Sequence, residues 1–150
     1  MDREDHGTHR NLTNRLKVAE RAIRIVQDLL AQLGPITVED GVMRAGRRVL
    51  NDDTRIVDEV AERTRFGCTI FLGNVRIATT AVAKGEKGRA IGTSANAEIT
   101  ERVFERGETF RGQTTTIGRD WAIVYVPLND ATGERVGMLA TYRELLRFDD

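Results

Sequence analysis

Two short runs of strand-forming residues meet at Gly73-Asn74, and this feature constrains the fold of the chain most. Glycine and asparagine both tolerate the positive φ that a two-residue hairpin turn needs. The sequence therefore predicts a β-hairpin over residues 69–80. Strict alternation away from the turn predicts the pairs Leu72–Val75, Phe71–Arg76, Ile70–Ile77, Thr69–Ala78 and Cys68–Thr79.

The two faces of this hairpin differ in chemistry. One face is apolar and needs a helix or another sheet over it. The other face places Arg76 among Phe71, Thr69 and Ala78, and a guanidinium beside hydroxyl groups can line a wet cavity that suits a small anion. The alternative is an edge hairpin whose arginine is simply exposed, because most arginines are exposed.

Composition excludes several classes of protein. The 150 residues suit one domain, and the 23 basic and 23 acidic residues cancel, so no global field favours nucleic acid as a partner. The single cysteine, Cys68, excludes an internal disulfide and Cys-x-x-Cys metal sites. Its place on the apolar face predicts a small core residue rather than a nucleophile.

Membrane segments are not evident in the sequence. No apolar run approaches the roughly 20 residues that span a bilayer, and the N-terminus lacks the apolar core of a signal peptide. We therefore expect either a soluble protein or a soluble domain taken from between membrane segments.

A long helix is predicted over residues 11–34, after a polar leader that holds His6 and His9, which we do not expect to bind metal. Gly34-Pro35 ends it. Its first apolar stripe is Leu12, Leu16, Ala19, Ile23, Val26, Leu30 and Leu33, and its second is Val18, Ala22, Ile25 and Leu29. One stripe can cover the sheet while the other meets a partner helix in a homodimer. Alternatively, both stripes are buried in one subunit.

The remaining segments predict an α+β fold. We expect a loop over 35–50 with an extended piece at 41–50, a helix from an Asn51-Asp52-Asp53 cap to about Arg65, and a glycine-rich turn at Lys84–Gly88. A helix follows Ser94 and ends at Gly107. Strands over 109–117, 121–128 and 135–142 complete a mostly antiparallel sheet of five strands.

The strand at 121–128 alternates Trp121, Ile123 and Tyr125 on one face. Two rings with polar edges can wall a ligand cavity, and core packing with the polar atoms at the rim is the alternative. We find no enzyme motif, since the only serine, Ser94, stands where a helix cap is expected. We also expect no cofactor and no metal, because neither histidine nor the cysteine falls at a plausible ligand position on the sheet.

Short motifs follow one another along the chain: Asp40-Gly41, Val49-Leu-Asn51, Cys68–Thr80, Arg89-Ala-Ile-Gly-Thr93, Gly107–Gly112, Tyr125–Asp130 and Val136-Gly-Met-Leu139. In this order and spacing they resemble a single Cache domain, from about Gly34 to Ala140. Bacterial chemoreceptors and sensor kinases carry such domains outside the membrane. The resemblance implies a PAS-like antiparallel sheet behind a long N-terminal helix and a ligand cavity on the opposite side of the sheet. It also implies dimers through that helix and flanking transmembrane helices in the parent protein.

The chain is also similar, more distantly, to the sensor domains of citrate- and dicarboxylate-sensing histidine kinases. That resemblance implies that Arg76 binds a ligand carboxylate. A second arginine of those kinases is matched here by Ile123, and a histidine of their arginine strand is matched by Thr79. A second carboxylate facing an isoleucine would be desolvated without compensation, so the implied ligand is smaller and less charged than citrate.

These arguments predict that the whole chain, 1–150, is a periplasmic sensor domain of an inner-membrane chemoreceptor, with the helix within 1–34 and the sheet within 66–143. The expected ligand is a small monocarboxylate such as acetate, propionate or pyruvate. Its predicted site consists of Arg76, Thr80, Arg89, Trp121, Ile123 and Tyr125, although solvent exposure of Arg89 is equally compatible with the sequence. The alternatives are the sensor of a histidine kinase or cyclic-dinucleotide enzyme, a cytosolic PAS-like module with flavin or haem, and a dimerisation module without ligand.

Overall fold

The computed structural model describes residues 3–82, 88–116 and 119–145. Its helical elements are α1 (Arg3–Leu33), α2 (Arg55–Thr64), α3 (Ala97–Ile99) and the π-helix η1 (Thr100–Glu105). Its strands are β1 (Ile36–Glu39), β2 (Val42–Ala45), β3 (Arg48–Val49), β4 (Gly67–Leu72), β5 (Val75–Thr79), β6 (Phe110–Thr116), β7 (Arg119–Asn129) and β8 (Arg135–Glu144).

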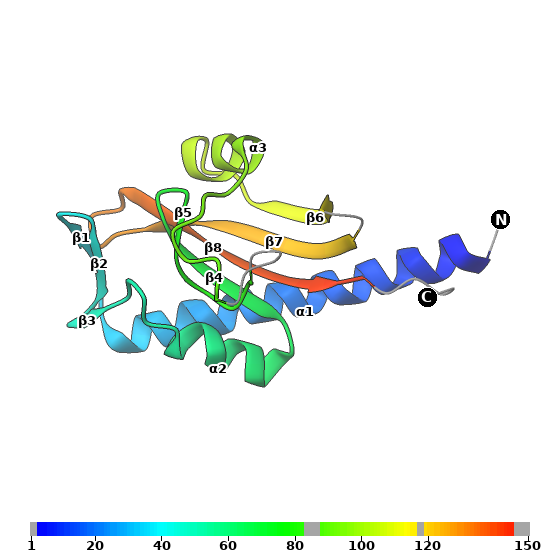
Figure 1. Ribbon diagram of the computed structural model, residues 1–150, viewed down its shortest axis with the longest axis horizontal. Helices are drawn as coiled ribbons and strands as arrows, with labels where there is room; N and C mark the ends of the chain where they lie inside the picture. Colours follow the sequence, from blue (N-terminus) through cyan, green and yellow to red (C-terminus); the bar gives the residue numbers. More distant parts are fainter. Residues whose placement is uncertain (1–2, 83–87, 117–118, 146–150) are drawn as a thin grey trace.

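Three layers make up the molecule (Figure 1). The central layer is an antiparallel sheet of five strands in the order β5-β4-β8-β7-β6. One face of this sheet is covered by α1 and α2, and the other by α3 and η1. The first turn of α1 and the end of β8 lie toward one end of the molecule, and β1 to β3 lie at the opposite end. The predicted α+β class and the five-stranded antiparallel sheet are confirmed.

Helix α1 is longer than predicted, because it begins at Arg3 and includes His6 and His9. The residues treated as a leader contain no proline, and their single glycine costs a helix only about 1 kcal/mol, so nothing there stops the helix. The predicted end is confirmed. Leu33 is the last helical residue, and Gly34 takes a φ of 134°, outside the helical range.

Most of the first apolar stripe of α1 is buried against the sheet. Ile23 is 5% exposed and Leu30 is 3% exposed. Val18, Ile25 and Leu29 of the second stripe are only partly buried. A buried hydrogen bond of 2.7 Å from the Thr141 hydroxyl to the Ala19 carbonyl oxygen ties β8 to α1. In the second stripe, Val18, Ile25 and Leu29 therefore keep surface that the sheet does not cover.

Placing a charge at Ile23 tests this packing. We expect Ile23→Asp to lower the free energy of unfolding by more than about 3 kcal/mol, since an unpaired carboxylate would be buried. Urea denaturation measures the loss, and Gln27→Asp on the exposed side of α1 is the matched control with an expected change within about 0.5 kcal/mol. A stable Ile23→Asp protein that has only lost a dimer in sedimentation would place Ile23 on the outside instead.

The segment after α1 was predicted as a loop with one extended piece, but it forms a second sheet of three short strands, β1-β2-β3. Asn51 holds this sheet through its side chain, which accepts a 2.8 Å hydrogen bond from the Met43 amide and donates one of 3.1 Å to the Gly41 carbonyl. Strands of two to four residues show too little alternation to be recognised in a sequence. Helix α2 then starts near its predicted cap, where the Asp53 carboxylate accepts from the Arg55 amide.

The register of the β4–β5 hairpin is as predicted only next to the turn. Leu72 pairs with Val75 and Phe71 with Arg76, but Ile70 then pairs with Ala78 and Thr69 with Thr79. A β-bulge lies between these two parts of the ladder and leaves Ile77 as the extra residue on β5. The pairs Ile70–Ile77, Thr69–Ala78 and Cys68–Thr79 are therefore wrong, because strict alternation cannot anticipate a bulge.

The helix over the other face of the sheet is capped by Asn96 and not by Ser94. The Asn96 carboxamide oxygen accepts a 2.8 Å hydrogen bond from the Ile99 amide. The element closes at Gly107 as predicted, with a φ of 73°. Arg135 of β8 holds this end by donating hydrogen bonds to the Phe104 and Glu105 carbonyl oxygens. Most of the predicted Lys84–Gly88 turn lies outside the described residues.

Candidate functional site

The face of the five-stranded sheet turned away from α1, here called the far face, carries most of the predicted site. Its side chains form three rows across neighbouring strands, about 7 Å apart along each strand. The first row is Arg76, Phe71 and Met138; the second is Thr79, Thr69, Ala140 and Tyr125; the third is Gly67, Tyr142 and Ile123. Polar groups therefore stand in each of the three rows of a largely apolar face.

Arg76 stands in the first row and is partly buried. Its Nη1 donates hydrogen bonds of 3.1 Å to the Thr93 hydroxyl and 2.9 Å to the Ser94 carbonyl oxygen. Its guanidinium carbon lies 5.3 Å from the centre of the Phe71 ring, in cation–π range. No Asp or Glu of the described residues forms an ion pair with it. Because a guanidinium has five N–H donors, donors remain for an anionic ligand.

Tyr125 joins Arg76 in an aromatic group. Its ring centre lies 6.1 Å from that of Phe71 and 6.3 Å from that of Phe110. Burial raises the pKa of the Tyr125 phenol, and the positive charge of Arg76 opposes that rise. Tyr125 is 8% exposed, so the structure brings these two predicted site residues together at a nearly closed place.

Four hydroxyl groups gather around the second row, and we call them the hydroxyl cluster: Thr69, Thr79, Thr80 and Tyr142. The Thr69 and Thr79 oxygens are 2.7 Å apart. The Tyr142 oxygen lies 3.2 Å from that of Thr69, 3.4 Å from that of Thr79 and 3.1 Å from that of Thr80. Of these residues, only Thr80 was predicted to belong to the site.

The bulge in β5 explains why the cluster escaped prediction. Alternation puts Arg76 and Thr79 on opposite faces, whereas the extra residue Ile77 returns Thr79 to the far face. Tyr142 could have been found, because it shares the parity of Met138 and Ala140 on β8. No motif drew attention to it.

Trp121 and Ile123 lie on the far face, as alternation along β7 predicts. The Trp121 ring meets the Tyr142 ring edge-on at 6.2 Å between centres. Ile123 pairs with Tyr142 across the β7–β8 ladder and is 8% exposed. Both residues thus adjoin the hydroxyl cluster, while Tyr125 adjoins Arg76.

Arg89 is placed differently from the other five predicted residues. Its guanidinium makes hydrogen bonds of 2.6 Å and 3.2 Å to the two carboxylate oxygens of Asp58 on α2, and another of 3.1 Å to the Thr79 carbonyl oxygen. The hydrogen bond to Asp58, more than the nearby charges, raises the pKa of Arg89. Arg89 therefore bridges α2 to the edge strand β5, an engagement that the sequence did not suggest.

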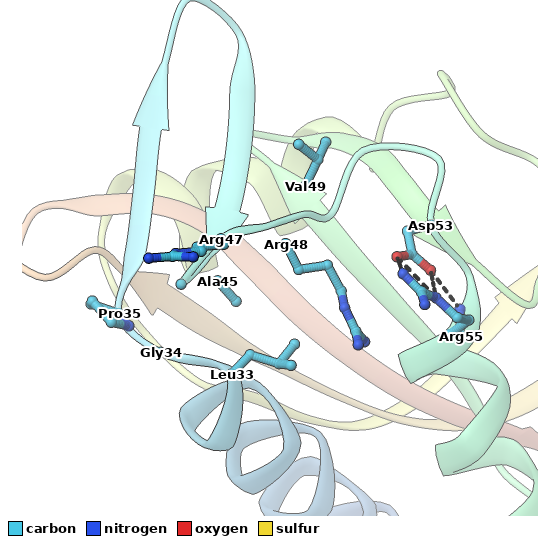
Figure 2. A pocket seen from close by; sticks show the side chains of 10 residues that line it. Leu33, Gly34, Pro35, Ala45, Arg47, Arg48, Val49, Asp53 and Arg55 are labelled. Atoms are coloured by element: carbon cyan, nitrogen blue, oxygen red, sulfur yellow. Dashed lines mark hydrogen bonds and ion pairs between the residues drawn. The ribbon is translucent and has the colours of Figure 1, made fainter.

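Grooves also open at the end of the molecule that carries β1 to β3. One of about 770 Å³ is lined by Leu33, Gly34, Pro35, Ala45, Gly46, Arg47, Arg48, Val49, Asp53 and Arg55 (Figure 2). Asp53 and Arg55 form an ion pair of 2.6 Å in it. A second groove of about 430 Å³ lies beside the turn between β7 and β8. Neither groove contains a predicted site residue.

Other chemistries find little support in the described part of the chain. No group of His, Cys, Asp or Glu residues there could hold a metal ion. Burial raises the pKa of the Cys68 thiol to about 12, so this cysteine is a core residue and not a nucleophile. Among these residues no helix has both the length and the apolar character to cross a membrane.

Comparisons with known proteins agree with this architecture. A crystal structure of the E. coli DcuS sensor domain matches with a TM-score of 0.50 and 16% sequence identity, over 92% of this chain and 91% of that chain. At this identity the likeness shows a common fold. No curated protein sequence matches. The family model described as single Cache domain 3 matches residues 48–143, well over half of the chain, and the protein therefore belongs to the single Cache domain 3 family.

Proposed function

We propose that this Cache domain is the periplasmic ligand-binding part of a bacterial transmembrane chemoreceptor and that it recognises a small monocarboxylate such as acetate, propionate or pyruvate. Membership of the single Cache domain 3 family supports a role as an extracytoplasmic sensor and not as an enzyme. The arrangement of the chain supports membrane anchoring at both ends, because the first turn of α1 and the end of β8 lie toward the same end of the molecule (Figure 1).

The environment of Arg76 is the main support for a carboxylate as the ligand. It is partly buried on the far face, its cation lacks an ion-pair partner among the described residues, and Phe71 and Tyr125 surround it. A ligand carboxylate would neutralise the Arg76 guanidinium and pair with it through two parallel hydrogen bonds. Thr93 and Ser94, which already bind Nη1, hold the guanidinium in a fixed orientation.

The rest of the far face supports a single carboxylate. Ile123, which stands where citrate sensors are expected to carry a second arginine, is buried at 8% exposure. A second carboxylate beside it would lose its hydration without gaining a cation. The aromatic ring of Tyr125, which adjoins Arg76, would instead lie against the carbon atoms of a short acid.

Signalling would use the contact between β8 and α1. Thr141, which bonds the Ala19 carbonyl, lies between the far-face residues Ala140 and Tyr142 on β8. A ligand that favours one position of β8 would thereby favour one position of α1, and only such differential binding shifts an equilibrium. We propose that the output passes through a homodimer of α1 helices that meet at Val18, Ile25 and Leu29.

A thermal-shift screen of small organic acids tests the proposal. An acid present at about one hundred times its Kd should stabilise the domain by about 2.7 kcal/mol, which raises the Tm by roughly 5–10 °C for a chain of this size. Tricarboxylates such as citrate should give no shift. If no small acid raises the Tm, the far face is a closed core, and the alternative of a dimerisation module without ligand is favoured.

A further inference from the structure

The hydroxyl cluster lies in the two rows beyond Arg76 on the far face. Its members bind one another, and the Thr80 hydroxyl also donates a 3.5 Å hydrogen bond to the Cys68 carbonyl oxygen. We infer that this cluster recognises an oxygen on C2 or C3 of the acid, so that the domain prefers hydroxy- and oxo-carboxylates to plain alkyl carboxylates. The inference rests on the proposed function, since it concerns the end of the acid that lies away from the carboxylate bound by Arg76.

The position of Tyr142 is fixed by two neighbours. Residue 67, opposite it on β4, is a glycine, and a Cβ there would lie 2.2 Å from the Tyr142 ring. The ring therefore lies across β4, and its hydroxyl reaches the threonines of β4 and β5. Trp121 holds the ring from the β7 side. A hydroxyl group held this firmly is preorganised to bind a ligand oxygen.

The spacing suits a small acid. Arg76 is opposite Phe71, and Thr69 is two residues further along β4, or about 7 Å. A short acid can therefore span this distance, because its two hydrogen bonds of about 2.8 Å each account for most of it. Between these points β8 presents Ala140, a smaller side chain than Met138 and Tyr142 on either side.

The cluster can serve either kind of ligand oxygen. In each contact among its four hydroxyls, either atom can be the donor. The backbone contacts of the cluster are amide hydrogen bonds donated from Cys68 to Thr80 and from Ala81 to Thr79, and a hydrogen bond from the Thr80 hydroxyl to the Cys68 carbonyl oxygen. Because the O–H groups can rotate, the cluster can donate to a keto oxygen or accept from a hydroxyl. Thr80 and Tyr142 are only partly buried, so they are its accessible members.

Isosteric acids separate this inference from the proposed function. Calorimetry with pyruvate, L-lactate, D-lactate and propionate compares ligands that share a carboxylate and differ at C2. We expect pyruvate or one lactate to bind the wild-type domain about tenfold more tightly than propionate, as one additional neutral hydrogen bond allows. In Tyr142→Phe the preference should fall to near one while propionate affinity is kept.

Each result decides one of the two proposals. Equal affinity for propionate and the oxygenated acids in the wild type, or an unchanged preference in Tyr142→Phe, overturns the inference and leaves the proposed function standing. Binding of none of the four acids contradicts both. Thr80→Val is a second variant in case Tyr142→Phe folds poorly, and Thr37→Val on β1, an exposed position away from the far face, is its matched control.

Discussion

Replacing Arg76 by alanine is expected to weaken binding of a small acid by more than tenfold, while the domain stays folded. Where the bound ligand buries the pair, losing one side of a charge-assisted contact costs on the order of 2 to 5 kcal/mol. The fold should survive, because Arg76 packs on Phe71 at the edge strand and the core between the sheet and α1 does not include it. Calorimetry with the tightest acid of the thermal screen measures the loss.

Arg63→Ala is the matched control for this variant. Arg63 lies on α2, half exposed, and pairs with Glu59 at 3.1 Å on the solvent side. Its removal takes away one positive charge without touching the far face, so acid affinity should stay within twofold. Unchanged affinity in a folded Arg76→Ala protein would remove this arginine from the site and with it the main reason to name a carboxylate.

Gly137→Ala is expected to be the most damaging single substitution on the sheet. Gly137 pairs with Leu72 at the β4–β8 ladder, and a Cβ there would lie 1.9 Å from the Phe71 carbonyl oxygen. Backbone atoms cannot rotate away as a side chain can, so the two central strands must separate locally. We expect a loss of more than about 3 kcal/mol in the free energy of unfolding, or at least about 6 °C in Tm.

Gly112→Ala controls for the general effect of adding a methyl group to a strand glycine. A Cβ on Gly112 of β6 would meet only the Phe110 ring, at 3.7 Å, which is ordinary contact. Its Tm should not fall, since alanine also loses less backbone entropy on folding. Similar Tm values for the two variants would show that β4 and β8 are less closely apposed than the structure indicates.

Much of the fold could be predicted because its signals are local. The turn at Gly73-Asn74, the helix stop at Gly34-Pro35 and the alternation of Trp121, Ile123 and Tyr125 each depend on a few neighbouring residues. The resemblance to Cache domains included the Val136–Leu139 motif but did not explain why a glycine stands within it. The structure supplies one, since only glycine fits at 137 against the Phe71 carbonyl.

The remaining features depend on contacts between distant residues. The β5 bulge brings Thr79 to the far face. The bulge is a feature of the pairing between β4 and β5 and not of either strand alone. The hydroxyl cluster joins residues 62 to 73 positions apart. Arg89 pairs with Asp58 across 31 positions. A single sequence carries no signal for such partners, so Tyr142 was missed and the role of Arg89 stayed open.

A crystal structure of the domain with the acid that raises its Tm most would locate the ligand. We expect the carboxylate on the far face, within hydrogen-bond distance of the Arg76 guanidinium and beside Tyr125, which is the basis of the proposed function. A carboxylate found instead in the groove with Arg47 and Arg48, or anywhere that Arg76 does not reach, would contradict it.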